Sequence, residues 1–349
     1  MSGGVDSSVA VYLMQQQGFD CIGVTMKLFN DDDIGVCKEK SCCSLEDSEN
    51  ARSVAYQLGI PYYVFNFTDD FKKQVICRFI DAYQNGATPN PCIDCNRYIK
   101  FDKLFIRAKQ LNVDCIATGH YARIGYDRVR DRFLLKKAVD STKDQSYVLY
   151  SMTQEQLKHS LFPLGELHKS DVRGIAVKQG FVNAHKHDSQ DICFVRDGDY
   201  SGFIEQYTGK TYSAGDFIDT HGNVLGRHKG LIRYTIGQRK GLGLALPKPM
   251  YVCSKNASDN TVTLCENDGL FTKSFDAADF NWIAYEKIDN SIRVKAKVRY
   301  GQTEQWATAT QISKGTVRVE FDEPQRAIAK GQAAVLYDGD AVVGGGTIV

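Results

Sequence analysis

The chain has 349 residues, of which 43% are hydrophobic and 24% charged, and its formal net charge is +1. This length predicts two or three domains, each with its own core. The small net charge excludes a uniformly basic coat for nucleic acid, although a local basic face remains compatible with it. Neither an apolar run long enough to span a membrane nor the features of a signal peptide occur, so we expect no membrane association.

The number of cysteines indicates the cellular compartment of the protein. Eleven cysteines without a secretion signal are typical of reduced thiols in the cytoplasm rather than of a disulfide framework. Five of them lie in apolar runs and are interpreted as inert packing residues: Cys21, Cys77, Cys115, Cys253 and Cys265.

Residues 1–205 alternate between short apolar stretches typical of buried strands and amphipathic stretches typical of helices. Strands are expected over 22–29, 62–67 and 114–118, and helices over 44–59, 69–83 and 96–111. Ser44 and Asp47 have the spacing of a capping box, and Gly59 stands at the expected end of that helix. This alternation predicts an α/β domain whose parallel sheet is covered by helices on both faces.

The pattern changes after residue 205, where helical periodicity fades. Residues 206–270 are predicted to form a small central β-rich module, and their segment 213–252 is rich in glycine and basic residues. Residues 271–349 contain short alternating runs and are expected to form a small C-terminal β-barrel, with a sandwich as the alternative.

A candidate phosphate-binding loop stands at the start of the chain. Residues 2–8 read Ser-Gly-Gly-Val-Asp-Ser-Ser and precede an apolar run at 9–14 that predicts a helix. Glycines let the backbone approach an anion, while hydroxyls and the helix N-terminus supply hydrogen-bond donors and positive dipole. A turn that merely caps a helix is the alternative, and the absence of lysine excludes a Walker-type loop. The string resembles the pyrophosphate-binding loop of the PP-loop ATP pyrophosphatases, which cleave ATP to AMP and pyrophosphate.

In folds of that kind the loop follows a central buried strand, and here nothing precedes it. Loss of a central strand leaves unpaired backbone groups and costs on the order of several kcal/mol. We therefore expect a mis-assigned or truncated N-terminus, with the first strand missing.

Two cysteines have surroundings suited to sulfur transfer, which needs a thiol that carries a persulfide and usually a second thiol to resolve it. Cys95 lies in a proline-broken segment that opens a helix, with Arg97 and Lys100 close by, so a lowered thiol pKa is expected. Cys193 lies between polar runs in Asp-Ile-Cys-Phe at 191–194.

Metal binding is the alternative use of these thiols. Cys92 and Cys95 have the spacing of half a zinc site or of a redox pair, but no second C-x-x-C accompanies them. An iron–sulfur cluster on Cys92, Cys95 and Cys193 also stays open. A further local group is interpreted as surface thiols without shared chemistry: Cys37, Cys42 and Cys43.

Eight strings carry a resemblance to the tRNA-specific 2-thiouridylases (MnmA) over nearly the whole chain. They are S-G-G-V-D-S-S at 2–8, T-P-N-P-C-I-D-C-N at 88–96, A-T-G-H-Y-A-R at 117–123, K-D-Q-S-Y at 143–147, D-I-C-F at 191–194, Y-T-I-G-Q-R-K-G-L-G at 234–243, E-P-Q-R-A-I at 323–328 and Y-D-G-D at 337–340. The resemblance implies an adenine nucleotide α-hydrolase-like (PP-loop) domain over 1–205. It also implies ATP-dependent adenylation of the carbon 2 oxygen of the wobble uridine in tRNA. Sulfur then passes from a cysteine persulfide to give 2-thiouridine, with AMP and pyrophosphate released.

The resemblance further implies the site residues. ATP, with Mg²⁺, would be bound by Met1, Ser2, Gly3, Gly4, Val5, Asp6, Ser7, Met26 and Gly119. The tRNA would meet Lys143, Asp144, Gln145, Arg299 and Tyr300, and its flipped base would meet Asn90, Pro91 and Cys92. Cys95 would be the nucleophile-side thiol and Cys193 the persulfide carrier, with a disulfide between them after sulfur release. The expected partners are tRNA and a persulfide donor, either a cysteine desulfurase or a relay protein.

One position departs from the family. Many relatives carry aspartate where this chain has Cys92, and that acid is a candidate proton handler for the uracil. Either Asp94 compensates, or Cys92 itself takes part in sulfur handling.

A run of basic residues is interpreted as a contact for tRNA phosphates, with a solvated connector as the alternative. It consists of Arg227, Lys229, Arg233, Arg239 and Lys240. Two other functions compete with thiolation: an amide- or guanidine-forming ligase with the same loop, and a non-catalytic RNA-binding or iron–sulfur protein. The paired thiols argue against the ligase, because nitrogen transfer does not need them.

Overall fold

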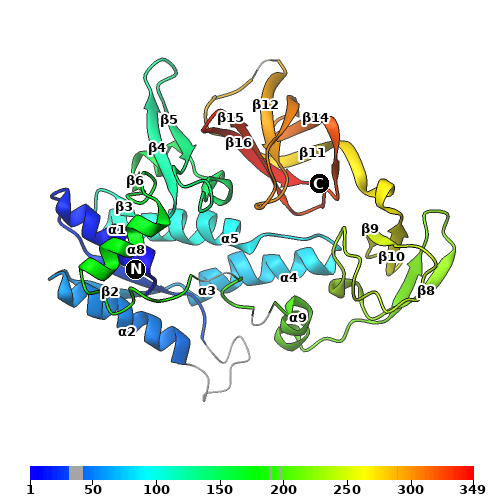
Figure 1. The fold of residues 1–349 in the computed structure, drawn as a ribbon, viewed down its shortest axis with the longest axis horizontal. Coiled ribbons are helices and arrows are strands. Elements are labelled where there is room, and N and C mark those ends of the chain that lie inside the picture. Colours follow the sequence, from blue (N-terminus) through cyan, green and yellow to red (C-terminus); the bar gives the residue numbers. More distant parts are fainter. Residues whose placement is uncertain (31–41, 189–190, 196–197, 289) are drawn as a thin grey trace.

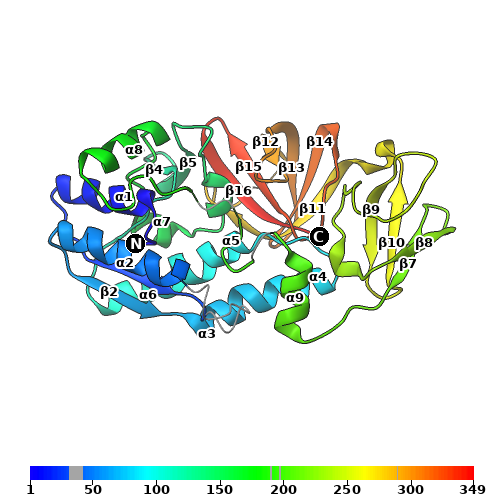
Figure 2. The same ribbon diagram turned by 60° about the horizontal axis from the view of Figure 1, so that its bottom comes forward.

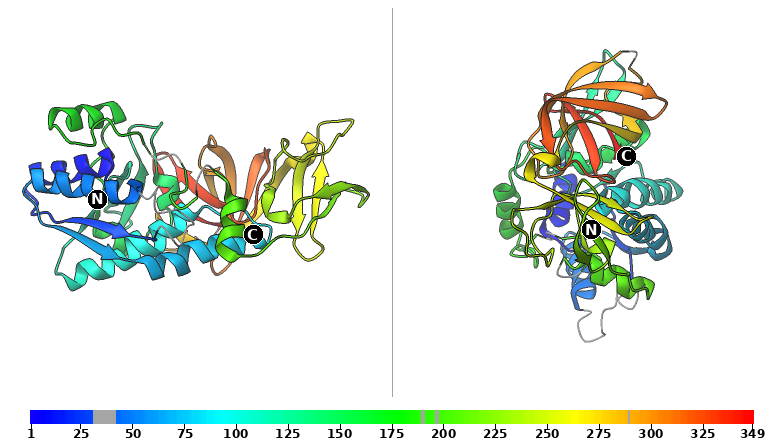
Figure 3. Two further views of the ribbon diagram at one scale, coloured as in Figure 1. Left: turned by 90° about the horizontal axis from the view of Figure 1, so that it is seen from below. Right: turned by 90° about the vertical axis from the view of Figure 1, so that its right-hand side faces the viewer.

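The computed structural model describes residues 1–30, 42–188, 191–195, 198–288 and 290–349. It has an N-terminal α/β part, a central β module and a C-terminal barrel. Figure 1 shows the N-terminal helices at one end of the long axis and the central module at the other. The barrel lies between them, as Figures 2 and 3 also show. In the described part of the chain, no helix is both long enough and apolar enough to cross a membrane.

The N-terminal part contains parallel strand pairs, as the alternation of elements predicted. Strand β1 (Gly23–Lys27) pairs with β2 (Tyr62–Asn66), and β3 (Ile116–Ala117) pairs with β6 (Ser160–Leu161). These pairs form separate two-stranded pieces among the described residues. The amino group of Met1 donates to the carbonyl of Val24, so the first residue of the chain lies beside β1.

Helices α1 (Val5–Gln16), α2 (Cys42–Gln57) and α8 (Lys169–Lys178) belong to the same part. Their apolar residues share one core, which includes Val9, Val54 and Val172. Helix α2 begins at Cys42, two residues before the predicted start at Ser44. The capping box expected there depends on the Ser44 side chain, which lies outside the described residues. The helix ends as expected, with Gly59 at a φ of +67°, a conformation that favours glycine.

Two helical stretches contain π-helical turns that the apolar periodicity did not reveal. The first comprises α3 (Thr68–Phe71), the π turn Lys72–Ile76 and α4 (Cys77–Gln84). The second comprises α5 (Pro91–Asp94), the π turn Cys95–Lys103 and α6 (Leu104–Gln110). It begins five residues before the predicted residue 96, because Asn90 caps it by accepting from the backbone N–H of Cys92 at 3.1 Å. Such π turns are frequent at functional sites.

The central module follows helix α9 (Tyr200–Thr208). Its sheet has the order β8-β7-β10-β9, with bounds β7 (Gly215–Ile218), β8 (Val224–His228), β9 (Tyr251–Asn256) and β10 (Thr261–Cys265). Its core gathers Phe217, Tyr234 and Val262. The module is β-rich, as predicted, although β7 and β10 pair in parallel.

The C-terminal strands form a closed barrel rather than a sandwich, because the first strand pairs with the last. The bounds are β11 (Phe271–Trp282), β12 (Ile292–Lys297), β13 (Gln305–Ser313), β14 (Thr316–Arg326), β15 (Ala333–Asp338) and β16 (Ala341–Ile348). Among the described residues they follow the order β11-β14-β13-β12-β15-β16, and β11 also pairs with β16.

The barrel and the N-terminal part share a core. The hairpin β4 (Ala122–Asp127) and β5 (Arg132–Lys137) extends the barrel sheet through Lys136 opposite Ala341. Tyr147 of the short helix η5 (Ser146–Leu149) packs into the same cluster as Val335 and Tyr337. The barrel therefore lies against the segment that precedes α7 (Gln154–Lys158).

Candidate active site

The predicted phosphate loop is a tight turn at the start of α1. Gly3 has a φ of +70°, and a Cβ atom there would lie 2.2 Å from the carbonyl oxygen of Asp47. The Ser7 hydroxyl accepts from the Ser2 backbone N–H at 3.1 Å and donates to the Gly4 carbonyl at 3.0 Å. The unpaired N–H groups of the first helical turn, from Val5 onward, make this end of α1 suited to an anion.

Two other segments hold the loop in place. The side-chain amide of Asn183, almost fully buried, donates to the Gly3 carbonyl and to the Ser8 hydroxyl, each at 2.9 Å. A Cβ atom on Gly119 would lie 2.8 Å from the backbone of Asp6, so only glycine permits this contact. Met26, predicted to line the adenine side, lies on β1 next to the strand residues that contact Met1.

A network of ion pairs, which the sequence analysis missed, begins at Asp6. Lys169 Nζ lies 2.7 and 2.8 Å from the two Asp6 carboxylate oxygens and 2.8 Å from Asp188 Oδ1. Tyr121 donates to Asp6 at 2.8 Å, and Lys143 Nζ lies 2.8 Å from Asp188 Oδ2. The loop itself has no lysine, and Lys169 at the start of a distant helix places a cation there. The available signal was the polar string His-Lys-Ser-Asp at 168–171.

The three candidate sulfur residues are electrostatic neighbours. Cys95 is buried, whereas Cys92 and Cys193 are exposed. The packed chain around Cys193 raises its pKa, and the thiols of Cys95 and Cys92 raise it further, while the ammonium of Lys100 opposes this. The structure therefore brings Cys92, Cys95 and Cys193 together, although they come from two separate segments.

The lowered pKa expected for Cys95 is wrong. Burial raises the pKa of this thiol and outweighs the opposing effect of Lys100. Cys95 also lies a full turn inside the helix, which begins at Pro91, so it is not at the N-terminal end of the dipole. Arg97, the other expected cation, pairs with Asp279 of the barrel instead.

Lys100 connects the phosphate loop with the thiols. Burial, followed by the charge of Lys100, lowers the pKa of the Met1 amino group to about 5. The same ammonium lowers the pKa values of Cys92 and Cys95, against the larger effect of burial. One side chain therefore influences both the amino end of the loop and the thiols.

The barrel contributes Tyr300 to this region. Its hydroxyl donates to the backbone carbonyl of Asp144 at 3.0 Å. Its pKa is raised by burial, by Asp144 and by Cys92, which places Tyr300 near the predicted base-contacting loop. Arg299, its neighbour, donates to the carbonyl of Ala327 at the barrel end.

The side chains of Asp144 and Gln145 are engaged within the chain. The carboxylate of Asp144 accepts from the backbone N–H of Ala138 at 3.0 Å and from the Ser146 hydroxyl at 2.8 Å. Gln145 accepts from the backbone N–H of Tyr121 at 2.9 Å. Their contact with tRNA stays a prediction.

Protein side chains of the described ranges do not by themselves build a metal centre. Within the described ranges, no group of three or more His, Cys, Asp or Glu side chains is arranged to hold a metal ion. The cysteines that the structure describes are all free thiols, so Cys95 and Cys193 are not joined. Cys37 and the side chains of Cys42 and Cys43 lie outside the described residues.

Part of the predicted basic run is neutralised. Arg227 pairs with Asp216 at 2.9 Å, and Arg233 pairs with Glu205 at 2.7 Å. The remaining cations are exposed and have no ion pair among the described residues: Lys229, Arg239 and Lys240.

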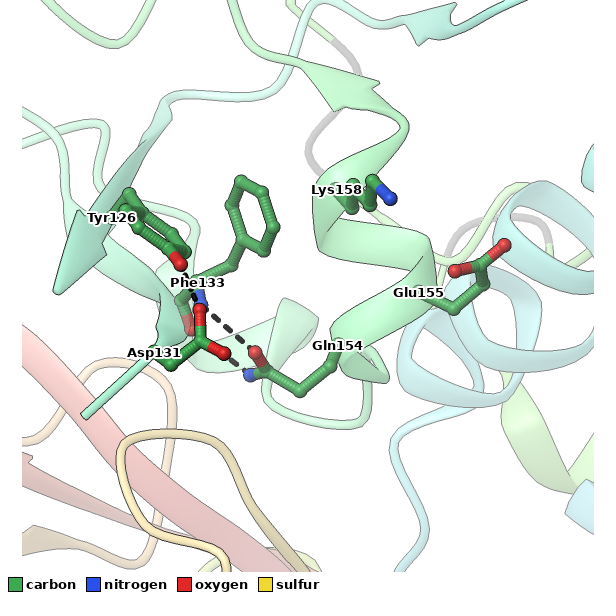
Figure 4. Close-up of a pocket in the computed structure, with 6 residues that line it drawn as sticks. All are labelled: Tyr126, Asp131, Phe133, Gln154, Glu155 and Lys158. Atoms are coloured by element: carbon green, nitrogen blue, oxygen red, sulfur yellow. Dashed lines mark hydrogen bonds between the residues drawn. The ribbon is translucent and has the colours of Figure 1, made fainter. Parts of the chain in front are cut away.

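The structure also has a surface hollow that none of the predicted site residues lines. It is lined by Tyr126, Asp131, Phe133, Gln154, Glu155 and Lys158, from the β4–β5 hairpin and α7 (Figure 4). Among these residues, Gln154 accepts from the backbone N–H of Phe133 at 2.8 Å. None of the predicted site residues lines it, so it does not mark the reaction site.

Three family models match consecutive stretches of the chain. A tRNA methyl transferase HUP domain matches residues 1–197, a tRNA methyl transferase PRC-barrel domain matches 201–266, and an aminomethyltransferase beta-barrel domain matches 272–348. The first of these covers more than half of the chain, and the last agrees with the closed barrel seen here.

Curated relatives match over the full length. The chain is 52% identical over 348 residues to the tRNA-specific 2-thiouridylase MnmA of Clostridioides difficile, covering 100% of this chain and 96% of that protein. It is 52% identical over 349 residues to the protein of the same name from Acetivibrio thermocellus, covering 100% and 97%. The Lachnoclostridium phytofermentans protein of that name is 50% identical over 350 residues, covering 100% and 98%. The chain belongs to the tRNA-specific 2-thiouridylase family.

Proposed function

We propose that this protein uses ATP to convert the wobble uridine of tRNA to 2-thiouridine. The observation that carries this proposal is the full-length match to tRNA-specific 2-thiouridylases, at 52% identity over 348 residues. The influence of Lys100 on the pKa values of Met1, Cys95 and Cys193 supports it. A nucleotide-activating loop and a sulfur-carrying group must reach the same atom of the substrate, because the second step displaces what the first one attached. The family relationship supports the choice of tRNA as substrate.

The first step is adenylation of the uracil oxygen. The close backbone contacts at Gly3 and Gly119 fix the turn of the loop, which would form a cradle for phosphate groups. The N–H groups at the start of α1 would stabilise the departing pyrophosphate. Asp6 is the carboxylate that would hold Mg²⁺, which supplies charge neutralisation on the phosphates. The ammonium of Lys169, already beside Asp6, adds a positive charge at the same place.

The second step is sulfur transfer. The terminal sulfur of a persulfide on Cys193 attacks carbon 2, and AMP leaves with the former uracil oxygen. Attack of the Cys95 thiolate on the Cys193 sulfur breaks the persulfide S–S bond and leaves a Cys95–Cys193 disulfide. The electron pair of the broken bond stays with the sulfur on the base, and a thiol reductant then restores both cysteines.

In this scheme, Asp94 is the residue that handles the proton at the uracil. Burial raises the pKa of Asp94, against the opposing effect of Arg78, so its carboxyl retains a proton more readily than an exposed aspartate. The chain packed around Cys92 also raises the pKa of this exposed thiol, so little of it is present as the thiolate that could act as a base. Both shifts support compensation by Asp94 for the aspartate that many relatives carry at position 92.

The scheme defines the partners and the compartment. A persulfide donor protein must load Cys193 before each turnover, and the exposure of this residue supports such a transfer. Free thiols are needed at both cysteines, which supports a reducing, cytoplasmic location.

Nucleoside mass spectrometry tests the proposal. Wild-type protein incubated with unmodified tRNA, ATP, Mg²⁺ and a persulfide source should form 2-thiouridine at the wobble position. Cys193→Ser should form none while its affinity for ATP stays within about twofold of wild type, because the loop does not depend on that sulfur.

Cys21→Ser is the matched control, since Cys21 is a free thiol outside the convergent group. It should thiolate tRNA at the wild-type rate. Thiolation by Cys193→Ser at that rate would remove the persulfide step, and absence of product with the wild-type protein would contradict the function itself.

A further inference from the structure

Asp188 lies between the two halves of the candidate site. Its Oδ1 atom is 2.8 Å from Lys169 Nζ and 3.0 Å from an Arg173 guanidinium nitrogen. Its Oδ2 atom is 2.8 Å from Lys143 Nζ. One carboxylate thus contacts a lysine that reaches Asp6 in the phosphate loop and a lysine in the segment predicted to meet tRNA.

The charged side chains around Asp188 are held in place by ion pairs. Lys169 is 9% exposed, and its ammonium contacts both Asp6 and Asp188. Partial burial raises the pKa of Asp188, but hydrogen bonds from Lys143 and Lys169 outweigh it and bring the pKa to about 2. Asp188 is therefore ionised throughout the physiological range, and a buried cation such as Lys169 needs that charge to remain in place.

The position of Lys143 follows from the same contact. Lysine has a flexible side chain that loses considerable conformational entropy when one geometry is selected. The side chain of Lys143 is partly exposed, at 37%. Its ion pair with Asp188 directs the ammonium toward the phosphate-loop side of the site rather than into solvent.

We propose that Asp188 is a positioning residue for the thiolation reaction, which fixes Lys169 on the nucleotide side and Lys143 on the tRNA side. This inference rests on the proposed function, and it adds a residue through which the two substrates are aligned. Asp188 acts through the two lysines. Its removal therefore affects the alignment of the nucleotide and the tRNA more than the affinity for either substrate.

The Asp188→Asn variant separates these effects. It keeps the shape of the side chain and removes the charge, leaving Lys143 and Lys169 cationic but free to move. Turnover of tRNA should fall about tenfold to a hundredfold, since misplacement by an ångström is costly. Affinity for tRNA should be unchanged or tighter, because the cluster has lost a negative charge.

The measurement is steady-state 2-thiouridine formation with tRNA varied, together with direct tRNA binding and thermal unfolding. Asp276→Asn is the matched control, because Asp276 is similarly exposed and accepts from Arg318 at 2.8 and 3.0 Å on the barrel surface. It should leave turnover and tRNA affinity at wild-type values.

Two further variants make the inference sharper. Asp188→Glu retains the charge but displaces it by one methylene group, so it should recover the unfolding temperature and only part of the turnover. In a Lys143→Gln background, Asp188→Asn should reduce turnover less than it does alone. The ion pair through which Asp188 positions Lys143 is already absent from that background.

The inference is overturned if Asp188→Asn turns over within about twofold of wild type. A loss of turnover matched by an equal loss of tRNA affinity would overturn it too, since that pattern belongs to a merely structural role. If instead the wild-type protein forms no 2-thiouridine, it is the proposed function that fails.

Discussion

At the scale of single residues, burial and charge compete at the candidate thiols. Nearby cations alone led us to expect a lowered pKa at Cys95, yet its pKa is raised because the residue is buried. A thiol is unreactive while protonated, so the raised pKa values lower the fraction of reactive thiolate at these cysteines. A persulfide is more acidic than a thiol, and loading Cys193 with sulfur would therefore also activate it.

Lys100 is the cation that opposes burial at these thiols, and its removal is predicted to make them less reactive. In Lys100→Met the pKa of Cys193 rises further, so less thiolate is present at any pH below that pKa. Alkylation of Cys193 by iodoacetamide at pH 8, followed by peptide mass spectrometry, should slow by about tenfold.

Lys103→Met is the control for that experiment. Lys103 lies in the same π-helical turn but pairs with Asp70 at 2.9 Å. In this variant, Cys193 should be alkylated at the wild-type rate. Equal rates for Lys100→Met and wild type would show that Lys100 does not act on the thiol.

At the scale of secondary-structure elements, the site depends on contacts between segments that are far apart in the sequence. The turn between β3 and β4 meets the first turn of α1 at Gly119, and the segment after α8 meets the loop at Asn183. The Gly119 contact is between backbone atoms, whereas Asn183 uses its buried side-chain amide to reach the Gly3 carbonyl. Both contacts set the shape of the phosphate cradle.

Gly119→Ala should damage this cradle. The added Cβ atom would lie 2.8 Å from the backbone of Asp6, and backbone cannot move as easily as the end of a side chain. We expect a loss of about 1–3 kcal/mol in unfolding free energy and at least about tenfold weaker ATP binding, measured by denaturant titration and calorimetry.

Gly174→Ala provides the comparison, because a Cβ atom there has open space within helix α8. It should raise the unfolding free energy by about 0.5–1 kcal/mol without changing ATP affinity. Wild-type ATP binding by Gly119→Ala would show that the loop tolerates a displacement at this contact.

At the scale of the whole molecule, the barrel and the N-terminal part form one framework. Asn281 of the barrel donates to the carbonyls of Tyr150 and Met152 at 2.7 and 2.9 Å. The same interface places Tyr300 beside Asp144. The central module lies farther along the long axis (Figure 1). Its exposed cations are Lys229, Arg239 and Lys240.

Binding of tRNA should therefore depend steeply on salt. Replacing Lys229, Arg239 and Lys240 with glutamine is predicted to flatten the plot of log affinity against log salt by about one per residue that contacts phosphate. Arg227→Gln should change the slope little, because Arg227 is already paired with Asp216. The same slope for the triple variant and wild type would exclude this face from tRNA binding.

The sequence by itself determined the class of the fold and, in particular segments, the local structure. Short alternating runs predicted the β-rich central module and the C-terminal barrel, because side chains on alternate faces of a strand meet different surroundings. The glycine-serine string located the start of α1, since its residue types are the ones that an anion-binding turn requires.

Only the tertiary structure decided which distant groups act together. Lys169 and Asp188 follow Asp6 in the chain by more than 160 residues, and no local pattern indicates that they meet. The pKa of Cys95 was likewise decided by the burial that surrounding segments impose, whereas sequence reveals only the charges nearby. Local propensity depends on neighbours in the chain, but burial and ion pairing depend on neighbours in space.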